Sequence, residues 1–424
     1  MKRLIIIGLD GVPYGLLEDL SKEGVMPNTQ SLIKQGIFRQ MQSSLPEISS
    51  VAWSSIITGK NPAQHGIFGF TDFPQGTYRL SFPNFNDLKA SPFWKKDNSG
   101  KSVIINVPAT FPASELNGVH ISGFVALDLE RATYPPFLVP KLMKLDYRID
   151  VDSSKAHKSI DLFLRDLDTT LKARIETYRY LWDKEDWDTF MLVFTGTDRL
   201  SHFLWDAYED STHKYHSSFL DHFREIDKVI GEISEKINGS DCLIMLSDHG
   251  FELLHKNVNI NYLLQEEGFL ELKDISRKNF SDIDFATQAF ALDPARIYIN
   301  QKDKYPRGSV SPGKAKKVIN ELIDLFNSLK IEGRKVIKKI YRKEEIYSGP
   351  YLNQAPDLVL LGEEGFNLKA NIKAKSLWDK NIFTGKHTQP DAFLLVNGRF
   401  SKDIIPDAPC LTDVVEIMDR TRES

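Results

Sequence analysis

Six acidic and histidine side chains lie beside short apolar runs of strand length, where they could form metal sites. They are Asp10, Asp198, His202, Asp248, His249 and His387. In a parallel α/β sheet, the loops at the carboxyl ends of the strands meet along one edge, where ligands bind. Carboxylate oxygen and imidazole nitrogen together suit Zn²⁺ or Mn²⁺. We therefore expect these residues to gather around two neighbouring divalent cations.

The elements that must position these residues are predicted by the apolar pattern. Apolar runs recur with helical segments between them: Leu4 to Leu9, Val103 to Val107, Thr189 to Phe194, Leu243 to Leu246, Leu358 to Leu361 and Ala392 to Val396. Strands that are apolar on both faces and separated by helices are typical of a mainly parallel sheet covered on both sides. Residues 159–182 and 215–237 show apolar positions near the 3.6-residue helical period, so we expect them to form covering helices.

Each of these motifs also has a plain structural explanation when taken alone. Asp10 precedes Gly11, which would let the chain turn close to a cation, but an Asp at this point could equally begin a turn or cap a helix. Asp198 and His202 are four residues apart and would share one face of a helix. Such a pair also occurs by chance in many enzymes.

The remaining candidates depend on loops. Adjacent residues of a strand point to opposite faces, so Asp248 and His249 can serve one site only from a loop beyond the strand, which Gly250 would permit. His387 lies in a loop before the last apolar run. A turn Asp and exposed histidines are the alternative explanation. The combination of all six residues, rather than any single motif, favours metal binding.

A nucleophile is the next requirement, and serines crowd one segment of the chain. They are Ser43, Ser44, Ser49, Ser50, Ser54 and Ser55. The pattern predicts a loop that enters a helix at about Ser50, and this helix ends near Gly59. Ser49 would then lie at the helix cap, where free amides and the positive end of the dipole favour phosphate. Simple N-capping by Ser49 is the alternative.

Composition narrows the class of protein. The chain has 424 residues, a net charge of −4 and a pI near 6.2, with no sign of binding to a nucleic-acid polymer or an anionic membrane surface. Cys242 and Cys410 are the only cysteines, so a disulfide framework is not expected. No apolar run approaches the roughly 18 residues of a membrane span, and the N-terminal run is too short for a signal peptide. We expect a cytoplasmic protein that does not bind membranes.

The composition and the apolar pattern of the sequence change between about Leu264 and Tyr351. Residues 266–284 are polar and charged, 296–300 are typical of a strand, and 314–329 are typical of a helix. We predict a catalytic core formed by residues 1–264 and 351–424. Residues 265–350 would form a small inserted α+β subdomain, a lid that lies over the strand ends and shapes specificity, with approximate boundaries.

Several short motifs along nearly the whole chain resemble one known family in their order and combination. They are Gly8 to Gly11, Ser49 to Gly59, Asn61 to Pro62, His65 to Phe68, Thr197 to His202, Ser247 to Phe251, Ala355 to Leu358 and Gly385 to His387. The sequence resembles the type I phosphodiesterase/nucleotide pyrophosphatase branch of the alkaline phosphatase superfamily. The resemblance implies an alkaline phosphatase-like three-layer α/β/α sandwich with a mainly parallel central sheet.

The resemblance also implies a role for each candidate residue. One metal ion would be held by Asp198, His202 and His387. The other would be held by Asp10, Asp248, His249 and Ser49. Ser49 would attack phosphorus to form a phosphoseryl intermediate, which water would then hydrolyse. We expect Zn²⁺ in both sites, with Mn²⁺ as the alternative.

The expected substrate is a small-molecule phosphate ester, either a phosphodiester or a nucleotide pyrophosphate. Asn106, Trp53 and Phe111 are candidates to line its pocket, and each could instead be a packing residue. The alternatives are a phosphomonoesterase or a phosphotransfer enzyme similar to cofactor-independent phosphoglycerate mutase. A metal-dependent binding protein without catalysis is the alternative of another class. The sequence leaves the oligomeric state open.

Overall fold

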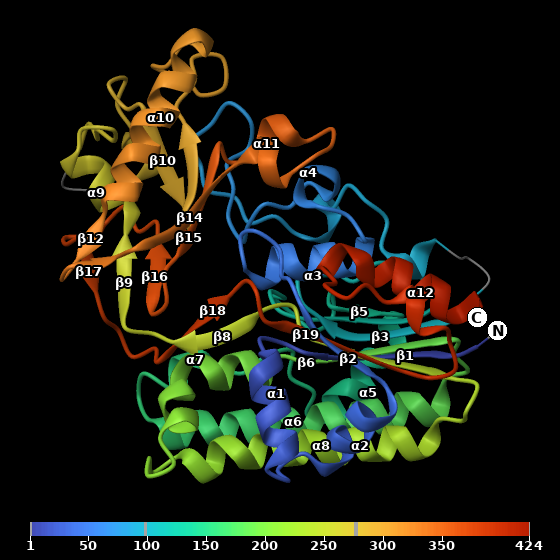
Figure 1. Ribbon diagram of the computed structural model, residues 1–424. Helices are drawn as coiled ribbons and strands as arrows, with labels where there is room; N and C mark the ends of the chain where they lie inside the picture. Colours follow the sequence, from blue (N-terminus) through green and yellow to red (C-terminus); the bar gives the residue numbers. More distant parts are fainter. Residues whose placement is uncertain (1, 97–99, 275–278, 424) are drawn as a thin grey trace. The chain divides into compact units, whose positions relative to one another are not determined.

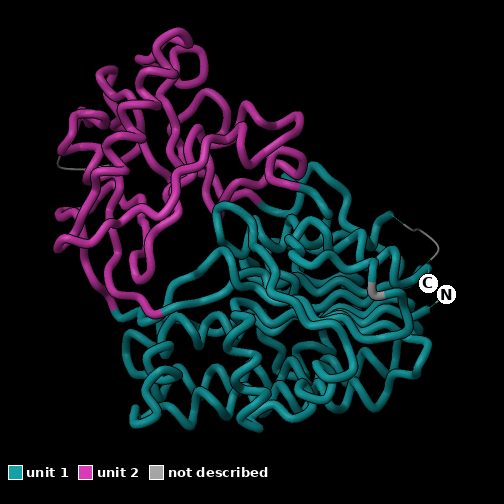
Figure 2. Tube along the Cα trace, in the orientation of Figure 1, with its two compact units in different colours: residues 1–60, 84–252, 382–424 teal, residues 61–83, 253–381 magenta. Residues whose placement is uncertain are grey.

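The computed structural model describes residues 2–96, 100–274 and 279–423, which divide into two compact units (Figure 2). Unit 1 comprises residues 1–60, 84–252 and 382–424, and unit 2 comprises residues 61–83 and 253–381. The predicted insertion, residues 265–350, falls within unit 2, although residues 275–278 lie outside the described part. Unit 2 also takes in residues 61–83, 253–264 and 351–381, which the sequence analysis assigned to the core.

Unit 1 is built on an eight-stranded sheet with the order β2-β19-β7-β1-β6-β3-β4-β5. The strands are β1 (Leu4–Leu9), β2 (Ile37–Met41), β3 (Ser102–Val107), β4 (Gly118–Ser122), β5 (Thr133–Tyr134), β6 (Thr189–Phe194), β7 (Cys242–Leu246) and β19 (Ala392–Asn397). The five strands from β7 to β4 pair in parallel, whereas β19 is antiparallel to both of its neighbours and β5 is antiparallel to β4. The mainly parallel sheet is therefore confirmed.

Helices cover both faces of this sheet (Figure 1). One face carries α1 (Tyr14–Lys22), α2 (Pro27–Gln35), α6 (Ile160–Lys184), α7 (Gly196–Glu209) and α8 (His216–Lys236). The other face carries α3 (Ser49–Thr58) and α12 (Val414–Glu423), while α5 (Val139–Lys144) is a further short helix of this unit. The predicted helices 159–182 and 215–237 correspond to α6 and α8. The three-layer α/β/α sandwich is confirmed.

The central strands are buried because they are apolar on both faces. All six residues of β1 and all six of β6 are buried, as expected for interior parallel strands. Gly8 of β1 allows a close approach by α3, since a Cβ atom at this position would lie 2.5 Å from Cη2 of Trp53. Trp53 is fully buried among the aliphatic side chains of the sheet. This contact fixes the helix that carries Ser49 against the central strand.

Unit 2 has its own sheet and its own hydrophobic core. Its four-stranded antiparallel sheet has the order β10-β11-β15-β14, and it is accompanied by smaller two- and three-stranded pairings. The elements are α4 (Pro62–His65), β9 (Lys256–Asn259), α9 (Ile260–Glu266), β10 (Ala289–Leu292), β11 (Arg296–Ile299), α10 (Pro312–Ser328), β12 (Lys330–Ile331), β13 (Arg334–Lys335), β14 (Ile337–Arg342), α11 (Lys343–Ile346), β15 (Leu358–Gly362), β16 (Phe366–Lys369) and β17 (Trp378–Asp379).

The run Leu358 to Leu361 illustrates a limit of the apolar pattern. It forms β15 as a strand, but β15 lies in the antiparallel sheet of unit 2 and not in the central sheet where we expected it. A buried strand is apolar on both faces in either setting, so composition alone does not distinguish the two sheets.

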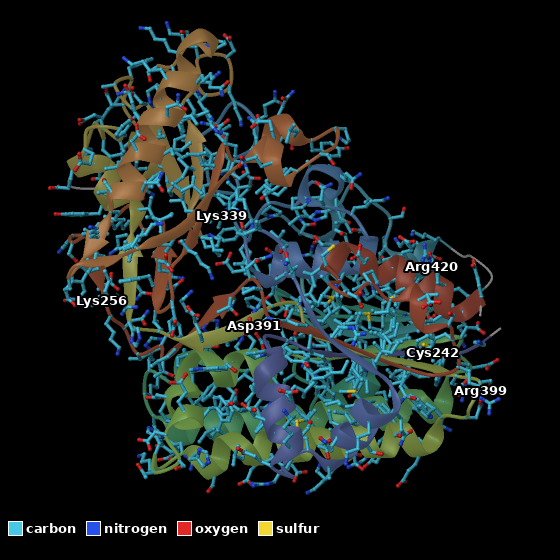
Figure 3. All side chains as sticks on the ribbon, viewed as in Figure 1. Cys242, Lys256, Lys339, Asp391, Arg399 and Arg420 are labelled. Carbon is cyan, nitrogen blue, oxygen red and sulfur yellow. The ribbon has the colours of Figure 1, made fainter. Side chains whose placement is uncertain are left out.

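Both cysteines carry free thiols, in agreement with the sequence analysis. Cys242 is buried in β7 (Figure 3), and Cys410 is partly exposed. Within the described part of the chain, no helix combines the length and apolar character that crossing a membrane requires.

Candidate metal centre

The central strand β1 delivers Asp10 to the edge of the sheet. Gly11 follows with a φ of 68°, and a Cβ atom there would lie 2.7 Å from the ring of Phe251. Glycine therefore lets the chain turn tightly at this point, as the sequence predicts. The backbone N–H of Gly11 donates to Oδ1 of Asp248 at 3.0 Å, which ties the end of β1 to the loop after β7.

The neighbouring strand β6 leads directly into α7, which carries Asp198 and His202 one turn apart. The predicted helical setting of this pair is confirmed. Thr197 anchors the start of α7, since its hydroxyl donates to the carbonyl of Asp10 at 2.6 Å. Asp198 is buried and His202 is partly exposed.

The strand on the other side of β1 supplies the next two residues. Asp248 and His249 lie between the end of β7 and the start of β8 (Gly250–Leu253), in the loop that the sequence requires for both to face one site. His387 lies on β18 (Gly385–Thr388), which pairs with β8. The short β8-β18 pairing thus brings His387 beside His249, and their rings stack with centroids 3.7 Å apart.

The three residues predicted for one metal ion lie together. Oδ1 of Asp198 is 3.2 Å from Nε2 of His387 and 3.6 Å from Nε2 of His202, and the two Nε2 atoms are 3.0 Å apart. His249 also belongs to this cluster, because the ligand atoms of Asp198, His249 and His387 lie within 4.8 Å of one another.

The second predicted group is also assembled. The ligand atoms of Asp10, Asp248 and His249 lie within 4.8 Å of one another, and all three residues are buried. The hydroxyl of Ser49 is 3.2 Å from Nε2 of His249 and 3.5 Å from Oδ1 of Asp10. His249 therefore lies where the two groups meet.

Ser49 differs slightly from its predicted position. It is the first residue of α3 rather than the cap, since Ile48 occupies the N-cap position, and no side chain caps this helix. The Ser49 hydroxyl is thus not used in capping and faces Asp10 and His249 instead. The plain N-capping alternative is wrong.

The tautomers of the three histidines are fixed by their second nitrogens. Nδ1 of His202, His249 and His387 faces the backbone carbonyls of Gly385, Gly250 and Glu47 at 3.3, 3.2 and 2.9 Å. A carbonyl only accepts, so each Nδ1 carries a proton, and Nε2 is the nitrogen left to direct a lone pair at a metal ion. This is the arrangement that metal-binding histidines adopt.

Burial favours a neutral His387 beside crowded carboxylates. Burial, together with His249 and His202, lowers the pKa of His387 to about 3. Burial raises the pKa of Asp248 to about 7, and burial followed by the charge of Asp248 raises that of Asp10 well above its usual value. Burial also acts to raise the pKa of Asp198, but His202, His387 and Arg199 lower it overall. Burial therefore disfavours the charged forms of Asp10 and Asp248, and a cation bound among these carboxylates would favour them.

Two contacts indicate that the residues fit divalent cations. In the Nδ1-protonated neutral rings, Nε2 of His202 and Nε2 of His387 are both lone-pair atoms, yet they face each other at 3.0 Å. Oδ2 of Asp248 is buried and has no hydrogen-bond partner among the described residues; the nearby Nε2 of His249, at 3.3 Å, is itself an acceptor. Such opposed acceptors are unfavourable unless a cation lies among them.

The three residues predicted to line the substrate pocket are all buried. Trp53 packs on Gly8, and the Asn106 side-chain amide donates to the carbonyl of Val193 and the hydroxyl of Thr195, each at 3.2 Å. Phe111 is 6% exposed, and the Arg131 guanidinium lies over its ring. All of these contacts are within the protein, and contact with a substrate stays a prediction for all three.

The sequence analysis missed two residues beside the site. Arg199 donates from Nη1 to Oδ2 of Asp198 at 2.8 Å, and it is paired on its other side with Asp150. An arginine directly after a candidate metal ligand is a signal that could have drawn attention. Asp150 lies 49 positions before Arg199 in the chain, and nothing in its local sequence marks it.

Comparison with known structures defines the class to which this fold belongs. Phosphonoacetate hydrolase from Sinorhizobium meliloti, in complex with phosphonoformate, is similar over 99% of this chain and 96% of its own, with 15% identity and a TM-score of 0.67. An inactive variant of murine ectonucleotide pyrophosphatase/phosphodiesterase 5, in complex with AMP, is similar over 100% and 95%, with 15% identity and a TM-score of 0.57. The human form has 14% identity and a TM-score of 0.58 over the same shares. The fold is thus alkaline phosphatase-like.

The family follows from the sequence itself. Residues 4–389 match the type I phosphodiesterase/nucleotide pyrophosphatase family, so the chain belongs to this family and to the alkaline phosphatase superfamily. A search of curated proteins found no match. Membership makes the chain a phosphohydrolase and implies dependence on divalent metal ions, for which the two side-chain groups are candidates.

Proposed function

We propose that this protein hydrolyses phosphodiesters or nucleotide pyrophosphates with two divalent metal ions and a phosphoseryl intermediate on Ser49. One observation carries the proposal. Three histidine Nε2 lone pairs, the carboxylates of Asp10, Asp198 and Asp248, and the Ser49 hydroxyl converge in one cluster. The Ser49 hydroxyl faces a carboxylate oxygen and an imidazole nitrogen, and such a hydroxyl is suited to nucleophilic attack once a cation compensates the negative charge.

Each residue has a distinct role in this proposal. Asp198, His202 and His387 would hold one ion, while Asp10, Asp248, His249 and Ser49 would hold the other. When bound, such ions stabilise the charge on the transferring phosphoryl group and favour the ionised form of a coordinated hydroxyl. Zn²⁺ suits the mixed carboxylate and imidazole donors, and Mn²⁺ is the alternative.

The chain's own chemistry proceeds in two displacements. Ser49 Oγ bonds to phosphorus as the ester bond to the leaving group breaks; the hydroxyl loses its proton, the departing oxygen takes one up from solvent, and the first product leaves. Water then attacks phosphorus, the bond to Oγ breaks, one proton of the water passes to Oγ, and the second product leaves with the water's oxygen. Asp10 and His249, at 3.5 and 3.2 Å from Oγ, orient the hydroxyl for the first step. The first turn of α3 offers backbone amides to the phosphoryl oxygens.

The substrate class is argued from the family and from the ligands of similar structures. The murine relative was solved with AMP and the bacterial one with phosphonoformate, both small anions bearing a phosphoryl or phosphonyl group. We infer by analogy that the substrate of this protein is also a small phosphate ester. The cytoplasmic location and the specificity role of residues 265–350 stay predictions of the sequence.

One assay separates the candidate functions. The full-length protein, reconstituted with Zn²⁺ or Mn²⁺, is tested against bis-p-nitrophenyl phosphate and p-nitrophenyl phosphate. We expect faster hydrolysis of the diester. Preference for the monoester would favour a phosphomonoesterase, and no hydrolysis of either would favour the binding protein. Acid quenching during turnover, followed by mass spectrometry, should detect phosphate on Ser49, and a burst of product without it would rule out the covalent step.

A further inference from the structure

Arg199 is held between two carboxylates at the edge of the metal centre. Its Nη1 donates to Oδ2 of Asp198 at 2.8 Å, while its Nε and Nη2 both donate to Oδ2 of Asp150 at 3.0 and 2.8 Å. The ring of Phe124 lies 4.2 Å from the guanidinium carbon. The Arg199 side chain is only 15% exposed. Three hydrogen bonds and the neighbouring ring restrict the orientation of the guanidinium.

The two carboxylate oxygens of Asp198 have different partners. Oδ1 faces Nε2 of His387 and of His202, whereas Oδ2 is engaged by Arg199. We propose that Arg199, held by Asp150, is a positioning residue that presents Asp198 to its metal ion through Oδ1 alone. The inference rests on the metal sites of the proposed function. The inference adds Arg199 and Asp150 as the residues that determine how Asp198 is presented to the metal ion.

Asp150 is itself anchored to the interior of unit 1. The hydroxyl of Thr195 donates to Oδ1 of Asp150 at 3.5 Å. The same hydroxyl accepts from Nδ2 of Asn106 at 3.2 Å and from Nη1 of Arg174 at 3.3 Å. Asn106 and Arg174 are buried. A chain of hydrogen bonds therefore runs from the buried end of β3 and from α6 to the metal ligand, and such outer contacts orient first ligands.

The charges explain why two carboxylates flank one guanidinium. An Arg paired with Asp198 alone would neutralise this ligand and weaken its attraction to a cation. Asp150 shares the charge of Arg199, so the group of three keeps a net charge of −1. A planar guanidinium can span both carboxylates with directed N–H groups, whereas a lysine ammonium is a point charge that cannot reproduce this fork.

The test measures Zn²⁺ binding to the intact protein by titration calorimetry, with stoichiometry checked by elemental analysis. We expect wild type to bind two ions. Arg199→Gln and Asp150→Asn should weaken one of them by about 10- to 100-fold and leave the other unchanged. Arg199→Lys should fall between Arg199→Gln and wild type. Excess Zn²⁺ should restore part of the lost activity, which a folding defect would not allow.

A matched control is available on the surface. Arg179 also lies between two carboxylates, those of Glu176 and Glu232, but its side chain is 42% exposed. Arg179→Gln should leave both zinc affinities unchanged. The Co²⁺ form adds a spectroscopic readout, because its visible absorption bands should change in Arg199→Lys, the variant least prone to misfold.

The outcomes are separable. Variants at Arg199 and Asp150 that bind both ions with wild-type affinity and give an unchanged Co²⁺ spectrum would overturn the positioning role while the proposed function stands. A wild-type protein that binds no divalent ion would overturn the proposed function and the positioning role together.

Discussion

The hydroxyl of Ser49 lies 3.2 Å from Nε2 of His249, although 200 residues separate them in the sequence. The contact exists because α3 packs against β1, and β1 and β7 are neighbouring parallel strands. A residue at the start of a helix and a residue in a strand-end loop are thereby brought to one site. Such meeting points at the carboxyl edge of a parallel sheet are where α/β enzymes bind ligands.

Ser49→Ala should abolish turnover while leaving metal content near normal. Loss of a covalent nucleophile typically lowers kcat by at least about 1,000-fold. The measurement is steady-state hydrolysis of bis-p-nitrophenyl phosphate beside elemental analysis of bound metal. Ser54→Ala is the matched control on α3, because the Ser54 hydroxyl only donates to the carbonyl of Ser50. Activity of Ser49→Ala comparable with that of Ser54→Ala would remove the covalent mechanism.

His387→Ala should lower both metal occupancy and rate. The substitution removes an Nε2 that lies within 3.2 Å of both Asp198 and His202, so the affinity of one ion should fall by more than about 100-fold. Metal stoichiometry after dialysis is the direct measurement. His213→Ala serves as the control, since His213 lies in the connection between α7 and α8, where its Nδ1 accepts from the N–H of Tyr215. Unchanged stoichiometry in His387→Ala would mean that the ligand set is misassigned.

The local elements of this fold could be predicted because buried parallel strands have a distinctive composition. The runs Leu4 to Leu9 and Thr189 to Phe194 correspond residue for residue to β1 and β6. The assignment of Leu358 to Leu361 to the central sheet failed because pairing partners depend on long-range topology. A short apolar run contains no information about which sheet it joins.

The site residues could be predicted only where their types and spacing form a motif within a short stretch of sequence. Asp198 and His202 are one helical turn apart, and Asp248 precedes His249 and a glycine, so their types and spacing are visible in the sequence. The residues that hold these ligands in place are not visible in the sequence. Asp150 reaches Arg199 across 49 positions, and the histidine tautomers depend on backbone carbonyls whose direction only the folded chain defines.

Metal affinity should fall as the pH is lowered below about 7. In the metal-free protein, burial raises the pKa of Asp248 to about 7 and that of Asp10 well above its usual value. A cation needs these groups as carboxylates, so binding must displace protons below that pH. For each displaced proton, affinity should fall about tenfold per pH unit. His387 should not add to this loss, because its pKa is lowered to about 3 and it stays neutral.

Calorimetry in buffers of different ionisation enthalpy counts the protons released as Zn²⁺ binds. We expect release at pH 6 and less at pH 8. Asp248→Asn should bind more weakly and release fewer protons at pH 6 than wild type. A zinc affinity that stays constant from pH 8 to pH 6 would contradict the assignment of these buried carboxylates as ligands.

Gly8→Ala should destabilise the protein and slow hydrolysis, because β1 and α3 touch at this residue. The added Cβ would lie 2.5 Å from Cη2 of Trp53 and 3.0 Å from Cγ2 of Val193, so the indole or the helix must shift. Such overpacking of a core typically costs about 1–3 kcal/mol in the free energy of unfolding. Since Ser49 lies one turn before Trp53 on α3, the shift should also move its hydroxyl away from His249.

Gly15→Ala is the control, because Gly15 is exposed on α1 with nothing within 4 Å of the added atom. This change should be neutral or slightly stabilising. Denaturant unfolding and kcat are measured for both variants, and equal stability of the two would show that Gly8 does not set the packing of α3 on β1.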